Sequence, residues 1–228
     1  MKKSNVKKSA GFSLIELMIA MTVMLVLLGL VSTLFSRAIG IRARESRRTD
    51  ALTSAQAALN VMSREIANSG FGLRNANTKK ALNGIVLVDS NADKIHFRSN
   101  LVNLETVSPL PADDITKPGE DITYFFDAVT DSIVRYDAHA VYNAGTNTYT
   151  GQTSVIINRI SSVKFDYFNY SGSVSTPTKT TVPTSDTGRI RITVTVKLEP
   201  VQGQPNNQTV TFTSDVTLRN SSYMLHQY

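Results

Sequence analysis

The apolar run from Leu17 to Ser36 constrains the fold of this chain more than any other feature. Its 20 residues include no charged side chain and are mostly aliphatic. At about 1.5 Å of rise per residue, a helix of this length spans roughly the 30 Å hydrocarbon core of a bilayer. The apolar part of a secretory signal is usually about 7–15 residues long and is followed by a small-residue cleavage site, and no such site follows here. The run therefore predicts a membrane-embedded helix.

A carboxylate, Glu16, stands directly before this run. Hydrocarbon cannot solvate an ionised carboxylate, so in lipid the group needs a partner. A local interpretation is that Ser13 and Glu16 form a capping box in the first helical turn, where an acid also suits the helix dipole. That interpretation does not account for the basic segment that ends at Gly11.

These residues together resemble the type III signal of type IV pilins and pseudopilins. The resemblance rests on a basic leader with Lys2, Lys3, Lys7 and Lys8, followed by Gly11, Phe12 and Glu16. It implies that a prepilin peptidase removes residues 1–11 by cutting between Gly11 and Phe12, and that Phe12 is then N-methylated. It also implies that Glu16 pairs with the terminal amine of a neighbouring subunit during assembly. Such an amine is largely charged at neutral pH, and opposite charges attract strongly in a low dielectric.

Composition locates the charge of the chain. The 228 residues carry a formal net charge of +6, which by itself would admit a nucleic-acid partner. Residues 1–80 contain 13 Lys and Arg against 4 Asp and Glu, whereas residues 81–228 contain 11 against 14. The basic residues belong to the membrane-proximal part, so a nucleic-acid partner is not expected. The chain has no Cys, so disulfides, thiol nucleophiles and Cys-type zinc sites are excluded.

Basic residues flank the apolar run on both sides. The second group is the arginine cluster Arg37, Arg42, Arg44, Arg47 and Arg48. The positive-inside rule therefore does not settle the topology. The resemblance places the N-terminus in the cytoplasm and the rest of the chain in the periplasm, anchored in the inner membrane by one span. Two roles stay open for the cluster: a collar that faces lipid headgroups, or pairing with acids of neighbouring subunits.

The helix is expected to continue past the membrane. Apolar residues recur at spacings of 3, 4, 3 and 4, which indicates an amphipathic helix with one buried stripe; they are Leu52, Ala55, Leu59, Met62 and Ile66. Asn68–Ser69–Gly70 is a plausible stop. We expect one helix over residues 12–69, about 87 Å long, with 12–36 in lipid or a filament core and 37–70 as its amphipathic continuation. A break between Gly40 and Arg48 is the alternative.

Past residue 71 the pattern changes to a period of two, which predicts β-strands. The expected strands are Ile85–Val88, Lys94–Arg98, Asp121–Phe126, Ser132–Tyr136, Ser154–Asn158, Val163–Phe168, Ile190–Leu198 and Val210–Leu218. The last two alternate most regularly and predict a hairpin that closes an antiparallel sheet. Ser171–Gly188 is rich in Ser, Thr and Pro and predicts a loop. The fold class is therefore α+β, a long helix packed on an antiparallel β-sheet domain of residues 71–228.

Several shorter stretches resemble a narrower group, the PilW-type minor pilins and the related J-type pseudopilins. They are Gln56–Leu59, Ser63–Ile66 and Gly70–Gly72 at the helix exit, then Val163–Phe168, Ser171–Gly172 and Val216–Asn220. This likeness is one of pattern and spacing. It implies a pilin-like fold.

Motifs for catalysis or metal binding are weak. Asp89–Asp93 begins like an EF-hand loop, but Lys94 and Asn100 stand where the motif needs Gly and Glu, so a polar turn is the better interpretation. Acids in the loop around Pro118–Gly119 admit a calcium ion, although solvated acids are commoner; they are Asp113, Asp114, Glu120 and Asp121. The three histidines, His96, His139 and His226, lack metal-ligand spacing. We expect no enzyme, no cofactor and no metal.

Aromatic side chains in the expected strands are assigned to the core rather than to base stacking. They are Tyr124, Phe125, Phe126, Tyr136, Phe165, Tyr167 and Phe168.

The resemblance implies a structural function. The first hypothesis is a minor pilin that helps to initiate, and caps, a type IV pilus, with prepilin peptidase, other minor pilins, the major pilin and the inner membrane as partners. The alternatives are a tip pseudopilin of a type II secretion system, a filament-tip adhesin, and a membrane-anchored envelope enzyme. An adhesin would use the polar segments Ser171–Gly188, Pro109–Gly119 and Asn143–Gly151.

Overall fold

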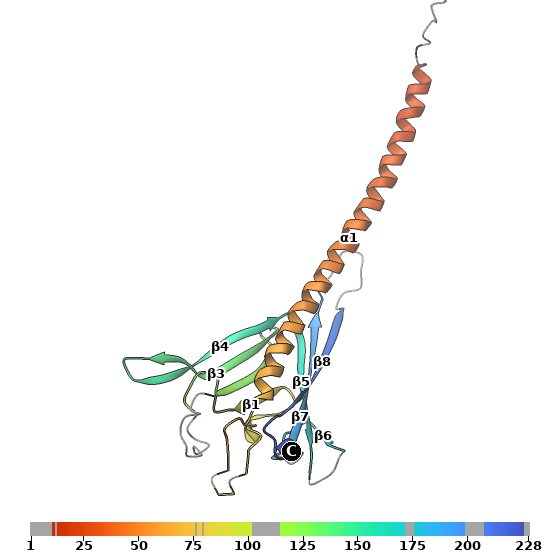
Figure 1. Ribbon diagram of the computed structural model, residues 1–228. Helices are drawn as coiled ribbons and strands as arrows, with labels where there is room; N and C mark the ends of the chain where they lie inside the picture. Colours follow the sequence, from red (N-terminus) through yellow and green to blue (C-terminus); the bar gives the residue numbers. More distant parts are fainter. Residues whose placement is uncertain are drawn as a thin grey trace, which may run out of the picture.

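A long helix projects from a domain of two β-sheets in the computed structural model of the chain (Figure 1). The structure describes residues 11, 13–75, 77–78, 80–101, 115–171, 176–198 and 208–225. The leader lysines, Phe12, Asp113, Asp114 and His226, for which predictions were made above, lie outside the described residues.

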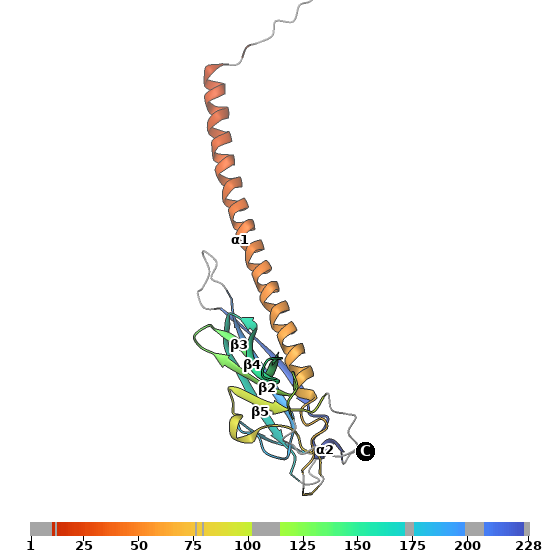
Figure 2. The same cartoon turned by 90° about the vertical axis from the view of Figure 1, so that its left-hand side faces the viewer.

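Helix α1 runs without a break over Leu14–Ala67, 54 residues or about 81 Å. The alternative of a break between Gly40 and Arg48 is therefore wrong. That segment contains no proline, and its alanine, isoleucine and arginine side chains are compatible with a helix. The sheet domain packs against one side of the C-terminal half of α1, and the N-terminal half stands clear of it (Figure 2).

The predicted helix stop at Asn68–Gly70 is confirmed. Asn68 caps α1, and Gly70 follows with a φ of 78°, a left-handed conformation that favours glycine. A side chain at Gly70 would overlap the carbonyl group of Leu82, so the turn also needs glycine for close packing.

The expected antiparallel sheet domain is confirmed, and its described residues form two four-stranded sheets. One has the order β1-β2-β3-β4, and the other has the order β6-β5-β7-β8. The strands are β1 Lys94–Arg98, β2 Asp121–Asp127, β3 Ser132–Asn143, β4 Thr148–Asn158, β5 Ile160–Asn169, β6 Thr178–Thr180, β7 Thr187–Lys197 and β8 Thr209–Thr217. A 3-10 helix, η1 (Leu87–Asp89), precedes β1, and a short helix, α2 (Ser222–Leu225), follows β8. The predicted hairpin is β7–β8, in register at Ile190 with Val216.

The core lies where the second half of α1 meets both sheets. The helix contributes Ala55, Ala58, Leu59, Met62 and Ile66, all nearly inaccessible to solvent. The predicted stripe is thus confirmed except at Leu52, which is 43% exposed. Facing strands contribute Ile95, Phe97, Tyr124, Phe165, Tyr167, Ile190, Ile192 and Val194.

Three strand and loop predictions need correction. Ile85–Val88 is not a strand: Ile85 makes one bridge to Phe97, and the chain then turns into η1, which leaves Val88 98% exposed. Ser171–Gly188 is not all loop, because β6 pairs there with β5. Strands β3 and β4 both extend beyond their predicted ends and join in a long hairpin, so Asn143–Gly151 is largely β-structure.

The aromatic core prediction holds for Tyr124, Phe165, Tyr167 and Phe168, which are buried. It is wrong for Tyr136, which is 38% exposed. Tyr136 lies over Gly151 of β4, on the face of the sheet away from the core.

Candidate functional site

The N-terminus of α1 places Glu16 in the first helical turn. The backbone N–H of Ser13 donates a hydrogen bond to a carboxylate oxygen of Glu16 over 3.1 Å, as a capping box requires. The carboxylate is otherwise exposed. The local capping role is therefore real, and it leaves the second carboxylate oxygen of Glu16 accessible to another molecule.

The apolar run of α1 is bare. Side chains from Leu14 to Ile41 are exposed, and by length and composition this stretch is able to cross a membrane. The most apolar part of this stretch is not buried against any other described part of the chain. Exposed aliphatic surface on this scale indicates burial in something outside the chain, either lipid or other helices.

The arginine cluster follows at the level where α1 approaches the sheets. Arg44 donates to the side-chain oxygen of Gln208, just before β8, over 3.3 Å. Arg37, Arg42 and Arg48 have exposed side chains. Arg44 therefore has a role within the chain, one that neither sequence-based interpretation of the cluster included.

A polar junction ties the end of α1 to the first sheet. One carboxylate oxygen of Glu65 accepts from the Tyr124 hydroxyl over 2.5 Å and from Nε of Arg135 over 3.0 Å. Arg135 also contacts Asp137, whose carboxylate accepts the backbone N–H of Gly119. Burial raises the pKa of the Tyr124 phenol, and the neighbouring charge of Glu65 raises it further. The junction therefore holds a neutral phenol and an ion pair, both partly buried, between helix and sheet.

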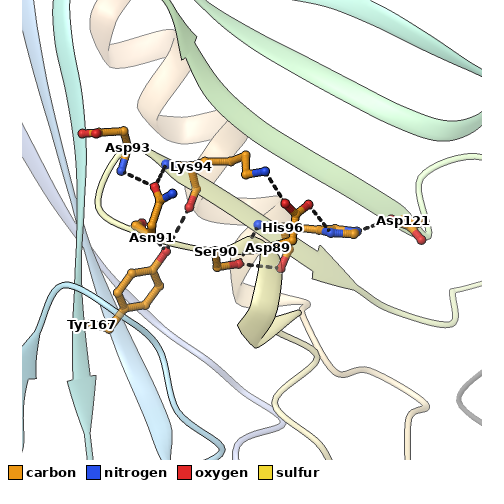
Figure 3. A network of polar contacts seen from close by, with 8 residues as sticks. All are labelled: Asp89, Ser90, Asn91, Asp93, Lys94, His96, Asp121 and Tyr167. Atoms are coloured by element: carbon orange, nitrogen blue, oxygen red, sulfur yellow. Dashed lines mark hydrogen bonds and ion pairs between the residues drawn. The ribbon is translucent and has the colours of Figure 1, made fainter.

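A second polar network lies on the outer face of the first sheet (Figure 3). His96 of β1 stands between two carboxylates: Nδ1 is 2.9 Å from Asp89 and Nε2 is 2.6 Å from Asp121. Lys94 pairs with Asp89, and Arg98 pairs with Asp121 over 2.9 Å. A neutral imidazole has one N–H, so His96 donates to both carboxylates only when it is protonated.

The acids of this network have depressed pKa values. A hydrogen bond from Lys94 lowers the pKa of Asp89 more than burial raises it. Burial raises the pKa of Asp121, but hydrogen bonds and charge from His96 and Arg98 outweigh it, and the net shift is downward. Both carboxylates are therefore ionised at neutral pH and already engaged.

The network borders an open pocket of about 480 Å³. Four members of the network, Asp89, Lys94, His96 and Asp121, line it together with Thr123, Phe125, Tyr136 and Ala138. Among the described residues, no group of three or more His, Asp or Glu is arranged to hold a metal ion. Asp89–Asp93 forms the polar turn expected of it: the side-chain oxygen of Asn91 accepts the backbone N–H groups of Asp93 and Lys94.

Sequence reasoning missed both networks. Glu65 and Tyr124 are 59 positions apart, and His96 and Asp121 are 25 apart, so no local pattern joins them. One signal was present: His96 and Arg98 are two residues apart in a strand, and such residues point to the same face. His139 lies in β3 and takes no part in the pocket, and Glu120 accepts the backbone N–H groups of Leu101 and Lys117.

Residues 6–32 match the protein family described as the prokaryotic N-terminal methylation motif. The predicted methylation signal is confirmed. The match ends within the apolar half of α1, and it does not reach the sheet domain.

The chain has a distant structural likeness. It is similar to one chain of the GspK-GspI-GspJ complex from the type 2 secretion system of enterotoxigenic Escherichia coli, at 11% identity and a TM-score of 0.40. The alignment covers 74% of this chain and 97% of the other. No curated protein matches the sequence.

Proposed function

We propose that this chain is a minor pilin, a structural subunit that helps to initiate assembly of a type IV pilus and caps it. The observation that carries the proposal is the methylation motif at residues 6–32, placed at the head of one continuous helix. The first half of that helix is bare and apolar, and its second half is buried under the sheets. Such a subunit stacks through its bare half and presents its folded domain outside.

Assembly proceeds in steps that assign a role to each N-terminal residue. The chain inserts into the inner membrane with its N-terminus in the cytoplasm, and a prepilin peptidase cuts between Gly11 and Phe12. Phe12 becomes the N-methylated terminus. The carboxylate of Glu16 then pairs with the amine of a neighbouring subunit, a charge pair that a low dielectric strengthens. Residues 12–36 form the filament core, 37–70 connect it to the sheets, and 71–228 form the outer domain.

The same features suit a tip pseudopilin of a type II secretion system. A pilus and a pseudopilus need the same processing signal and the same bare helix, so the local chemistry does not separate them. The difference lies in the partners and therefore in the phenotype.

The experiment is a clean deletion of the gene in its own bacterium, with pilus yield, twitching motility and protein secretion measured side by side. The proposal predicts loss of surface pili and of twitching with secretion intact, and recovery of both on complementation. Loss of secretion with normal pili would assign the chain to the pseudopilus instead. A chain carrying Glu16→Ala serves as the matched control, since it keeps the sheet domain and lacks the assembly charge.

A further inference from the structure

The two sheets have four edge strands, β1, β4, β6 and β8. An edge strand exposes unpaired backbone N–H and C=O groups, and proteins usually protect it by covering, by charge or by shortness. Three of the four edges are protected in these ways, whereas most of β4, from Thr148 to Val155, is not.

The protection of the other edges is visible in their contacts. The outer edge of β1 is covered by the preceding segment, whose backbone bonds include Val86 N–H to the His96 carbonyl over 2.9 Å and Arg98 N–H to the Gly84 carbonyl over 2.8 Å. Strand β6 has three residues, and one of them is Lys179. Strand β8 packs against α1, where the hydroxyl oxygens of Ser63 and Ser214 are 3.1 Å apart. Its Asp215 also forms an ion pair with Arg191 of β7.

Within the described residues, β4 lacks these features over Thr148–Val155. Beyond a register shift at Ile156 its C-terminal end is protected, because Ile157 is buried in the core and α1 contacts the strand. Its 11 residues, Thr148–Asn158, include no charged residue and no proline. Residues 150–155 are all exposed, among them Val155 at 59%. Among the residues that the structure describes, its backbone pairs with β3 alone. From Asp137 to Val141 the pairing shifts by extra residues on the β3 side, so Thr148–Val155 stays a regular strand.

Among the residues that the structure describes, the far half of the β3–β4 hairpin has no third strand. Strand β2 pairs with β3 as far as Asp137, and beyond it Val141–Asn143 pair with Thr148–Thr150. Figure 1 shows this two-stranded ribbon reaching past the body of the domain. A two-stranded ribbon by itself is marginal in water, and a third strand would stabilise it. Its exposed Tyr142 and the adjacent Tyr149 ring, 5.1 Å away, add apolar area for such a strand.

We infer that β4 is an interaction edge, where an extended, uncharged segment of a different filament subunit pairs as a fifth strand. This inference rests on the proposed function. Strand addition supplies backbone hydrogen bonds, and the alternating side chains supply specificity. Side chains on paired strands stand about 4.5–5.5 Å apart, and a charged partner residue would find no counter-charge on β4. The chemistry of the edge therefore selects an uncharged strand.

A second copy of this chain does not fit the edge in antiparallel pairing, the commoner arrangement of paired strands. Antiparallel pairing of β4 with itself has its two-fold axis perpendicular to the sheet. Because α1 packs along the sheets, that axis would reverse the direction of the partner's α1. The two apolar halves would then point away from each other and could not enter one membrane. Because antiparallel self-pairing is excluded, we assign the edge to a subunit of another kind.

Two Val→Lys variants test the inference in cells that assemble filaments. Val155→Lys places an edge charge of the kind that blocks strand pairing, and Val129→Lys is the matched control, since Val129 is 93% exposed in the β2–β3 turn. Both are expected to melt within about 2 °C of wild type. Val155→Lys is expected to lower recovery of the chain in sheared filaments at least about tenfold, equivalent to about 1.4 kcal/mol, and Val129→Lys is expected to leave it unchanged.

A photo-crosslinking amino acid in place of Thr153 provides a second experiment, which does not depend on the stability of the Lys variant. It is expected to give an adduct with another pilin, and the same group at Val129 is expected to give none. An adduct with a second copy of this chain would overturn the inference, as would no adduct together with normal recovery of Val155→Lys. Both results leave the proposed function intact if wild type is in the filaments. Absence of wild type from filaments would overturn the proposed function and this inference together.

Discussion

The hydroxyl of Tyr124 donates a 2.5 Å hydrogen bond to the carboxylate of Glu65, and so links the last turn of α1 to the centre of the first sheet. The phenol is buried, while the carboxylate also binds Arg135. This contact fixes the sheet domain to the helix that carries it. Loss of this hydrogen bond is therefore expected to lower the free energy of unfolding of the sheet domain.

Tyr124→Phe should lower the free energy of unfolding by about 1.5–3 kcal/mol, the usual contribution of a hydrogen bond to a charged group. The ring stays in place, and Glu65 keeps Arg135. Tyr142→Phe is the matched control, because Tyr142 is 52% exposed and its hydroxyl donates to a loop side chain, Asn147. Urea unfolding of the detergent-solubilised chain measures both. Equal changes in the free energy of unfolding would show that the buried hydrogen bond stabilises the domain no more than the exposed one.

Leu59→Ala should lower the free energy of unfolding by about 2–5 kcal/mol, because Leu59 is 2% exposed in the middle of the helix–sheet core. Leu52→Ala, on the same helix but 43% exposed, should change it by no more than about 0.5 kcal/mol. A small effect at Leu59 would mean that the sheets do not pack on this face of α1.

Acid should destabilise the domain through Asp89 and Asp121. Their folded-state pKa values lie below the usual 3.8, so their ionised forms stabilise the fold fully above about pH 4. This contribution is lost as the pH falls from about 4 through the depressed values. The groups that hold them ionised are Lys94, His96 and Arg98.

Unfolding free energies measured between pH 6 and pH 2 would follow this loss. Asp121→Asn should be less stable than wild type at pH 6, because His96 and Arg98 lose a charged partner, and should lose less stability than wild type on acidification. Parallel pH profiles for the two proteins would contradict the assignment.

The sequence predicted regular elements best where the residue pattern is unambiguous. The alternation from Ile190 to Leu198 and the helical stripe around Leu59 both result from the burial of one face. The spacing of the apolar residues therefore identifies the strand and the helix. The error at Ile85–Val88 has the opposite cause. Its apolar residues follow Gly84, which has a φ of 75°, and the chain turns into η1 instead of extending.

Strand ends and long-range contacts were harder to predict from the sequence. The continuation of β3 from Asp137 to Asn143 mixes small and polar residues around a register shift, which removes the alternation. Strand β6 has three residues within a Ser- and Thr-rich stretch, and its pairing with β5 is a tertiary contact. The Glu65–Tyr124 and His96–Asp121 contacts depend on how two elements meet, which no single segment encodes.

Glu16→Gln distinguishes the two roles of that carboxylate. The capping bond from the Ser13 N–H can be accepted by a glutamine oxygen, so a purely local role predicts normal assembly. A charge pair with a neighbouring amine predicts that Glu16→Gln fails almost as badly as Glu16→Ala, with the sheet domain and processing intact. Recovery of the chain in sheared filaments is the measurement. Normal recovery of the Gln variant would rule out the charge pair.

Mass spectrometry of the chain purified from its own membranes tests whether it is a processed prepilin whose mature form begins with the exposed apolar helix. The mature protein is expected to begin at Phe12, with a methyl group on its amine and without residues 1–11. A chain that keeps Met1–Gly11 in cells with an active prepilin peptidase would contradict this expectation.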